Sequence, residues 1–536
     1  MNYPKVIVPL FTAALFAGLA GCGSDNRETS STASLQKSQA CIGCHSAKTS
    51  PVTGNLITQE WLNSAHNTRN GAACPDCHKP TGHPNGGIIT NPLDAVCLEC
   101  HTQATMKTGA AHFDGSVSFN ATKAAYVTPN DANGCRVCHN PHDMTSLINI
   151  NKQWAESKHG LTTEPAWADS THKWKAPANS ACQRCHTETG YVYYMTNGLK
   201  IPGSTFFGQY TTGREVAGCK TCHIDYSWKR RTSDASFATF STPYKTPSGI
   251  PRTYATNLGD SRLCIPCHSG RESGESVKAI ADFTNVSFKN SHYLGAAGSF
   301  YQKIGYHFYT SATKMTNTWQ HSNIGVNNYV TSAGIATGSN GPCVACHMNG
   351  LHTWDPIEVA KSTGATGCYG CHGTDDMALL NEEERTIFER GMDFFAFTLN
   401  NGNIFYSTVY PYFYTTAAAT TAVKNWTVVG PTSDGSRNMG AAFNFNMLTR
   451  EKGAHVHNRT YARRLIFDSI QYLQTGTNTY STSTGTIGGT TDPNAQVSFT
   501  AYSTAVAAGT RPANATSITA LKGWLLRSSG GKYYRR

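Results

Sequence analysis

The sequence predicts a fold of irregular loops and short helices, with a small, mainly helical region toward the C-terminus. The first observation behind this is a five-residue motif, Cys-x-x-Cys-His, which occurs nine times between Cys41 and His372. The second is that Gly, Pro, Asn and Thr punctuate this stretch throughout, which favours turns over sheets or long amphipathic helices. The third is that only 39% of the 536 residues are hydrophobic, which is little for a chain of this length.

The motif has one chemistry that explains its spacing. Two cysteines three positions apart lie on one helical turn, so their thiols can form thioethers with the two vinyl groups of one haem. The histidine that follows projects onto the same face and can bind the iron as proximal ligand. Random placement of the cysteines and histidines would give roughly 0.03 such motifs. We therefore predict a multihaem cytochrome c whose loops and short helices wrap around a chain of nine c-type haems.

We number the motifs 1 to 9 in chain order. Their thioether cysteines are Cys41 and Cys44, Cys74 and Cys77, Cys97 and Cys100, Cys135 and Cys138, Cys182 and Cys185, Cys219 and Cys222, Cys264 and Cys267, Cys343 and Cys346, and Cys368 and Cys371. Their proximal histidines are His45, His78, His101, His139, His186, His223, His268, His347 and His372. Disulfides and zinc ribbons are the alternatives, but disulfides need no histidine after each pair and zinc ribbons do not need nine.

The N-terminus predicts export. Lys5 precedes an apolar run, Val6 to Phe16, that is too short to span a bilayer, so residues 1–21 are expected to be a signal peptide. The following Leu19-Ala20-Gly21-Cys22 resembles a bacterial lipobox, in which the cysteine becomes the acylated first residue. A free Cys22 behind an ordinary signal stays open as the alternative. Residues 22–38 are polar and are expected to form a flexible tether.

The formal charge of +11 does not indicate a nucleic-acid partner. Each haem brings two propionates, of which a ferric centre offsets one, so nine haems remove about nine positive charges. We expect many Lys and Arg side chains to pair with propionates and the oxidised protein to be near neutral.

Histidines outside the motifs are candidate distal ligands. Ten of them lie between residues 66 and 352, enough for bis-histidine coordination of nine irons: His66, His83, His112, His142, His159, His172, His292, His307, His321 and His352. His83, His142 and His352 follow a motif too closely to reach the far side of its haem, so each is expected to serve a neighbour. The roles of His455 and His457 stay open.

A second phrase, Trp-x-x-Ser-x-His, includes three of these candidates. It runs from Trp61 to His66, from Trp154 to His159 and from Trp167 to His172. We expect the indole to stack beside a porphyrin while the histidine reaches an iron. The aromatic residues that crowd the long gap between motifs 7 and 8 are also expected to pack on haems.

The predicted nonahaem domain covers residues 39–375, and the cysteines stop after it. Residues 376–475 are expected to be a haem-free helical region, with helices over Glu382–Leu399 and Asn458–Leu473. Asn458 can cap the second helix and Gly476 can end it. Residues 476–536 are expected to be a Thr/Ser/Gly-rich tail with a short helix near Leu521–Leu526, and the stretch from Gln474 to Ser517 offers little core.

With these features the chain resembles the outer-membrane lipoprotein multihaem c-type cytochromes of Geobacter-type metal-reducing bacteria. The resemblance rests on the lipobox, the dense motifs and two haem-free phrases, Asn438 to Asn444 and Gly453 to Ile470. It implies electron transfer at the outer membrane toward extracellular acceptors such as Fe(III) oxides. The implied partners are other multihaem cytochromes, an outer-membrane porin and the membrane itself through the lipid anchor.

Three functions are weighed. The leading hypothesis is an electron conduit without catalytic residues, since bis-histidine iron has no open position for a substrate. The second is a multihaem reductase of the nitrite, hydroxylamine or tetrathionate type with one open haem. Many of those replace a proximal histidine by lysine, and no Cys-x-x-Cys-Lys occurs here. The third is a subunit of a cytochrome filament, which a lipid anchor disfavours.

Overall fold

The structure is a computed structural model, and it divides into two compact units. Unit 1 contains residues 1–110, 127–152 and 223–229, and unit 2 contains residues 111–126, 153–222 and 230–536. Cys22 and the predicted signal peptide lie outside the described part of the chain. The residues that the structure describes are 25–50, 53–68, 72–83, 85, 96–97, 99–100, 124–125, 139–142, 148–161, 164–168, 174, 179–200, 214–224, 228–233, 244–255, 257–309, 319–363, 368–373, 375–478, 497–512, 515–529 and 532–535.

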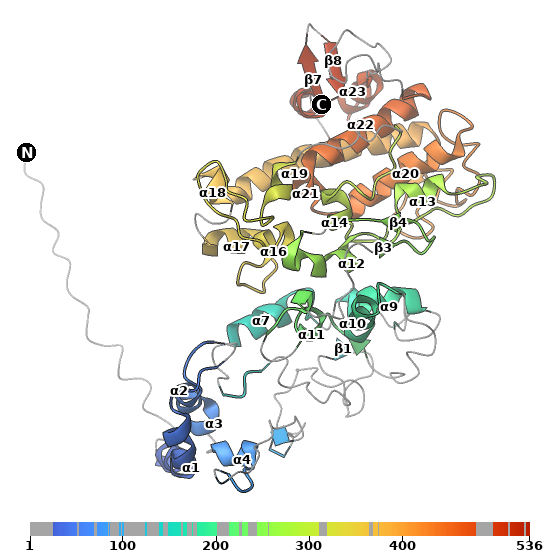
Figure 1. Cartoon of the computed structure of the whole chain (residues 1–536). Helices are drawn as coiled ribbons and strands as arrows, with labels where there is room; N and C mark the ends of the chain where they lie inside the picture. The colour runs from blue at the N-terminus through green and yellow to red at the C-terminus, as the bar shows by residue number, and fades with distance from the viewer. Residues whose placement is uncertain are drawn as a thin grey trace, which may run out of the picture. The chain divides into compact units, whose positions relative to one another are not determined.

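Unit 1 contains short helices joined by turns (Figure 1). Those described are α1 (Asp25–His45), α2 (Ile57–Asn63), α3 (Ala65–Thr68) and α4 (Cys74–His78), and α7 (Ile148–Glu156) begins in this unit. Helix α4 shows why a motif forms a helical turn. Pro75 occupies its first turn, where a missing N–H costs no hydrogen bond, and the Asp76 carboxylate accepts from the Ala73 N–H at 2.7 Å. Lys79, with φ of 40°, ends it.

Helix α1 differs from the flexible tether predicted for residues 22–38. The helix includes residues 25–38 of that segment and continues into motif 1. Ser34 and Ser38 are fully buried, and the Ser38 hydroxyl accepts a hydrogen bond from the Cys74 N–H at 3.0 Å. Small polar side chains therefore make the tertiary contact, which an analysis that looks for an apolar face does not detect.

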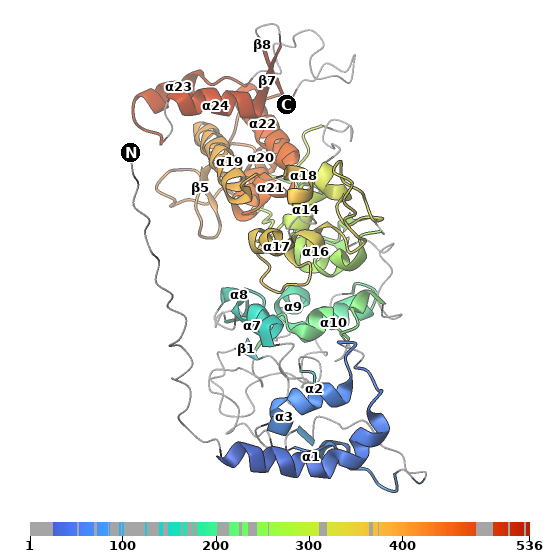
Figure 2. The same ribbon diagram turned by 90° about the vertical axis from the view of Figure 1, so that its left-hand side faces the viewer.

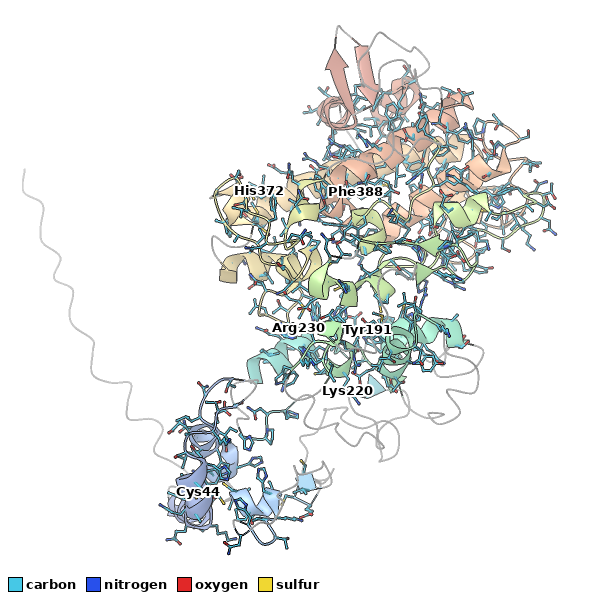
Figure 3. All side chains as sticks on the ribbon, viewed as in Figure 1. Cys44, Tyr191, Lys220, Arg230, His372 and Phe388 are labelled. Carbon is cyan, nitrogen blue, oxygen red and sulfur yellow. The ribbon has the colours of Figure 1, made fainter. Side chains whose placement is uncertain are left out.

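The haem-motif part of unit 2 also consists of short helices. These are α8 (Pro165–Ala168), α9 (Ser180–His186), α10 (Glu188–Thr196), α11 (Cys219–Cys222), α12 (Ile265–His268), α13 (Gly274–Lys278), α14 (Ala296–Phe300), α16 (Pro342–His347), α17 (Pro356–Thr363) and α18 (Tyr369–His372), with 3-10 turns η3 (Arg231–Ser233), η4 (Gly259–Leu263) and η5 (Gln320–Asn323). Figure 3 shows Tyr191 on α10 and His372 at the end of α18.

Strands are few and short among the described residues. They form four two-stranded pairs, of which only the first is parallel: β1 (Ala124–Ala125) with β2 (Arg214–Glu215), β3 (Tyr244–Lys245) with β4 (Pro251–Arg252), β5 (Phe405–Tyr406) with β6 (Phe413–Tyr414), and β7 (Leu526–Ser529) with β8 (Lys532–Arg535). In the longest pair Leu526 opposes Arg535 and Ser529 opposes Lys532.

The C-terminal part of unit 2 is a cluster of longer helices: α19 (Met377–Asn401), α20 (Gly435–Arg450), α21 (Ala454–His457), α22 (Arg459–Thr475), α23 (Thr500–Ala507) and α24 (Ala515–Leu525). Helices α19, α20 and α22 pack on one another, and α24 packs on α19 (Figures 1 and 2). Phe388 of α19 is part of their shared core (Figure 3). No helix in the described part of the chain is both long and apolar enough to cross a bilayer.

The two predicted C-terminal helices are confirmed, with the expected cap on the second. Asn458 Oδ1 accepts from the Tyr461 N–H at 2.9 Å at the start of α22, and Gly476 ends the helix with φ of 73°. Helix α19 begins earlier than predicted because the Asp376 side chain caps its first turn, accepting from Ala378 and Leu379.

Helix α20 was not predicted, because polar residues occupy buried positions of it. Asn444, fully buried, accepts from the Tyr306 N–H at 2.7 Å and donates to the Tyr306 carbonyl at 3.0 Å. A Cβ on Gly440 would lie 2.5 Å from the Tyr306 ring. Tyr306, Phe308 and Tyr309 consequently belong to the C-terminal core, while the packing of aromatic residues of this stretch on haems stays a prediction.

The Thr/Ser/Gly-rich stretch contributes more core than expected. Phe499, Tyr502 and Val506 are buried in the C-terminal core, and they share one face of the turn and helix that contain α23. The Tyr502 hydroxyl donates to the Asp393 carboxylate at 2.7 Å. This stretch therefore includes a short amphipathic segment that its overall composition did not indicate.

Candidate haem sites

Each described motif lies on a helical turn, as thioether attachment requires. Motif 1 ends α1, motif 2 forms α4, motif 5 ends α9, motif 8 ends α16 and motif 9 ends α18, while motif 7 joins η4 to α12. Sixteen motif cysteines are described. His101, Cys135 and Cys138 lie outside the described residues.

The motif histidines lie opposite second histidines at one recurring distance. Two imidazoles that bind one metal from opposite sides through Nε2, with metal–nitrogen bonds of about 2.0 Å, have ring centroids about 6.3 Å apart. Among the described residues six pairs match this separation. They are His45–His83 at 6.1 Å, His78–His142 at 6.1 Å, His186–His292 at 6.1 Å, His268–His159 at 6.2 Å, His347–His457 at 6.0 Å and His372–His321 at 6.3 Å.

Burial keeps several of these imidazoles neutral, which is the form that binds iron. Burial, and then repulsion from His268, lowers the pKa of His159 to about 3. Burial, and then repulsion from His78, lowers the pKa of His142 to about 4. The pKa of His268 is lowered to about 4, chiefly by burial. A buried neutral histidine pair fits a haem iron between the two rings.

Backbone carbonyls orient several of the rings through Nδ1. His186 Nδ1 lies 2.8 Å from the Ala166 carbonyl oxygen, His223 Nδ1 lies 2.9 Å from that of Trp228, and His347 Nδ1 lies 3.0 Å from that of Trp354. A proton held at Nδ1 by such a contact directs the Nε2 lone pair toward a metal. The rings are therefore in the tautomer and orientation that an axial haem ligand needs.

The Nδ1 atom of His457 contacts a carboxylate instead of a backbone carbonyl. Its Nδ1 lies 2.8 Å from Oε1 of Glu451, whose side chain is buried. Burial lowers the pKa of His457, but the hydrogen bond and the charge of Glu451 outweigh it, so the net pKa is raised. The sequence analysis left His457 without a role, because it lies beyond the last motif.

The Trp-x-x-Ser-x-His phrase docks twice in the same way. Trp61 Nε1 donates to the Ala72 carbonyl, and Trp154 Nε1 donates to the Ala217 carbonyl, both at 3.0 Å. Each acceptor lies two residues before the first cysteine of a motif, motif 2 or motif 6. The serine hydroxyl of each phrase, Ser64 or Ser157, turns back to the tryptophan carbonyl. The indole thus anchors the backbone beside a motif, a role that the expected porphyrin stacking did not include.

Other tryptophans contact the motif histidines or their opposite histidines directly. Trp174 stacks on His186 with centroids 4.0 Å apart and planes 15° apart. Trp354 lies 4.3 Å from the His159 ring, and Trp319 lies 4.7 Å from the His321 ring. These contacts restrict rotation of the imidazoles.

The remaining candidate histidines have varied surroundings. His66 Nδ1 lies 3.1 Å from the Pro141 carbonyl oxygen, the contact seen at His186. His307 Nε2 lies 2.7 Å from the Tyr461 hydroxyl, so an axial role for this residue would fall to Nδ1. The His352 N–H donates to Gln153 Oε1 at 2.9 Å. His112 and His172 lie outside the described residues.

Thiols of different motifs lie next to each other, which orders the motifs in space. In unit 2, Cys185 of motif 5 lies beside Cys267 of motif 7, and Cys264 of motif 7 lies beside Cys343 of motif 8. Cys346 of motif 8 and Cys368 of motif 9 also lie near each other. In unit 1, Cys41 of motif 1 lies beside Cys74 of motif 2.

Comparison with known proteins supports a haem function. The family described as a doubled CXXCH motif matches residues 66–106, which include His66 and motifs 2 and 3. The C-type polyheme cytochrome OmcB of Geobacter sulfurreducens is 29% identical over 75% of this chain and 65% of its own length. OmcC of the same organism is 31% identical over 59% of this chain and 45% of its own length. The multiheme cytochrome MtrC of Shewanella baltica is 22% identical over 39% of this chain and 31% of its own length.

No solved structure matches the chain. The chain spans 65% of the length of OmcB, so the comparison covers part of that protein. The motifs and the histidine pairs fit covalently bound haem. The chain is a homologue of the Geobacter polyhaem cytochromes OmcB and OmcC.

Proposed function

We propose that the chain is a nonahaem c-type cytochrome that conducts electrons at the outer membrane toward extracellular acceptors such as Fe(III) oxides. The observation that carries the proposal is the set of histidine pairs 6.0–6.3 Å apart. An iron with two histidine ligands has no open position for a substrate, so such a haem transfers electrons without making or breaking substrate bonds.

The six histidine pairs support a distal ligand for each of six motifs. His83 serves motif 1, His142 motif 2, His292 motif 5, His159 motif 7, His457 motif 8 and His321 motif 9. His83 and His142 thus bind the haem of a motif other than the one they follow. For motifs 3, 4 and 6 the distal ligands stay predictions, from among His66, His112, His172, His307 and His352.

The neighbouring thiols define the proposed path in unit 2. Because Cys185 contacts Cys267 and Cys264 contacts Cys343, the chain holds the attachment edges of motifs 5, 7 and 8 together, with motif 9 next to motif 8. Cys222 of motif 6 also lies near Cys264 and Cys267, so motifs 5, 6 and 8 are all neighbours of motif 7, which is not the order along the chain. In unit 1 the neighbouring Cys41 and Cys74 support a position of motif 2 beside motif 1.

The proposed location follows from the N-terminus and the relatives. Cys22 would bear the lipid after removal of residues 1–21, and residues after it would link the anchor to motif 1. Other multihaem cytochromes, and a porin in the outer membrane, are the proposed partners. The chain matches OmcB over 75% of its residues, and this homology supports an exported location.

The test is a haem count by pyridine haemochrome together with EPR of the fully oxidised holoprotein. We expect nine haems, all ferric and low-spin, and electron transfer from the reduced protein to Fe(III) oxide. A persistent high-spin centre would overturn full bis-histidine ligation and support the multihaem reductase, to be assayed with nitrite, hydroxylamine and tetrathionate. Assembly into filaments in solution would support the filament subunit.

Membrane attachment is tested separately with the Cys22→Ala variant. We expect the wild-type protein in the outer-membrane fraction with an acylated N-terminal peptide, and the variant released in soluble form with its haems intact. Equal fractionation of both proteins would overturn the lipoprotein proposal and leave the haem assignments standing.

A further inference from the structure

The Glu451 carboxylate is held rigidly against the His457 imidazole. Glu451 is 2% exposed, and its Oε1 accepts hydrogen bonds from His457 Nδ1 at 2.8 Å and from the Gly453 N–H at 3.0 Å. Gly453 is needed for this approach, since a Cβ there would lie 2.5 Å from Cε1 and 2.7 Å from Nδ1 of His457. An oxygen that accepts from two donors in a buried site has the character of a carboxylate anion.

The opposite ligand of the same pair has a neutral partner. His347 Nδ1 contacts the Trp354 carbonyl at 3.0 Å, and His186 of motif 5 contacts the Ala166 carbonyl at 2.8 Å. His223 Nδ1 of motif 6 also contacts a carbonyl oxygen, that of Trp228. Motif 8 therefore combines one ligand with a neutral partner and one with an anionic partner.

We propose that Glu451 is a positioning residue that lowers the reduction potential of the haem of motif 8. This inference rests on the proposed function and deepens it. A carboxylate that accepts the Nδ1 proton increases electron donation by the imidazole, because the ring takes on imidazolate character. Stronger donation stabilises ferric over ferrous iron, and the buried negative charge acts in the same direction.

Because of the position of motif 8, its reduction potential affects electron transfer between the neighbouring motifs. Motif 8 lies between motifs 7 and 9 in the proposed path, through the Cys264–Cys343 and Cys346–Cys368 neighbours. A lowered potential at motif 8 changes the free energy of two electron-transfer steps, the one from motif 7 and the one to motif 9. Glu451 would then affect the rate through this part of the chain.

The test is Glu451→Gln in the full-length holoprotein. Glutamine keeps an oxygen that can accept from Nδ1 and removes the charge. We expect nine low-spin haems as in wild type and a change in one low-spin EPR component. In spectroelectrochemical titration one redox transition should move most to a more positive potential, with a smaller shift at motif 7, because Glu451 also interacts electrostatically with His268. Glu451→Asp keeps the charge and should leave the potential closer to that of wild type.

The matched control is Asp393→Asn, which removes one charge from an ion pair with Arg511 in the same helical region, away from the histidine pairs. It should leave every potential unchanged. Unchanged potentials in Glu451→Gln would overturn the tuning role while leaving the ligand assignment intact. If His457→Ala also leaves every haem low-spin, the ligand assignment itself fails. Gly453→Ala provides an independent variant, expected to disturb the same EPR component by pushing on the His457 ring.

Discussion

The imidazole rings of His78 and His142 lie 6.1 Å apart and only 7° from parallel. The pair at motif 1, His45 and His83, has planes 27° apart. The four pairs of unit 2 differ, with interplanar angles from 52° for His347–His457 to 71° for His186–His292. The two units thus hold their ligand planes differently, and this difference has a spectroscopic signature.

We expect two classes of low-spin EPR signal from the oxidised protein. Parallel imidazoles interact with the same iron d orbital and split the d levels, which gives a rhombic spectrum. Steeply crossed imidazoles interact equally with two d orbitals, so their near-degeneracy gives a large maximum g value. Motifs 1 and 2 should give the rhombic class and motifs 5, 7, 8 and 9 the other. Low-temperature X-band spectra would decide, and His142→Ala should remove intensity from the rhombic class alone.

His457→Ala should convert one ferric haem from low-spin to high-spin. The substitution removes the ring opposite His347. His455→Ala is the matched control two residues away, because His455 Nε2 lies 3.0 Å from Asn381 Oδ1 and its ring contacts Phe388. EPR and the high-spin charge-transfer band of the visible spectrum measure the change. A high-spin centre in the control and none in the variant would reverse the assignment.

Gly160→Ala should disturb the coordination at motif 7. A Cβ at residue 160 would lie 2.4 Å from the Trp154 carbonyl oxygen and 2.9 Å from the Ala155 Cα, so the turn that presents His159 must shift. Overpacking of this kind costs about 1–3 kcal/mol, and we expect a lower thermal midpoint together with partial high-spin character. Gly43→Ala in motif 1, where no atom would lie within 4 Å, is the control. Equal behaviour of the two variants would show that the turn at Gly160 tolerates a methyl group.

Asn444→Ala should loosen the C-terminal helices from the segment that follows motif 7. It removes both hydrogen bonds to the Tyr306 backbone and leaves buried groups unpaired, which costs about 2–4 kcal/mol. Limited proteolysis and the urea midpoint measure the effect. Asn425→Ala, whose side chain contacts only the nearby Thr427 in the described structure, is expected to change either value little. Resistance of Asn444→Ala to protease equal to that of the control would show that the apolar core alone holds this segment.

The haem-attachment turns and the helix caps of this chain could be predicted from its sequence, because each depends on a short local motif. The motif spacing predicts one helical turn, and α4, α9 and α16 each contain such a turn. The cap at Asn458 and the ending at Gly476 are equally local. Such features depend on a few neighbouring residues, and the rest of the fold does not override them.

The pairing of histidines could not be predicted, because it depends on tertiary placement. His142 follows His139 by three residues, yet its ring lies opposite that of His78. His457 lies opposite His347, although α19 and α20 separate the two residues along the chain. Helix α20 could not be predicted from the sequence for a related reason. Its buried Asn438 and Asn444 bind backbone groups of distant segments, so the apolar periodicity that identifies a helix is interrupted where the contacts are most specific.

The distance in sequence between His347 and His457 also bears on how the protein is made. All nine motifs are present once residue 372 has been synthesised. The proposed second ligand of motif 8, His457, follows only after α19 and α20. By this assignment a chain truncated after the last motif would keep every attachment motif but lack one axial ligand, so the C-terminal helices would complete the coordination of motif 8.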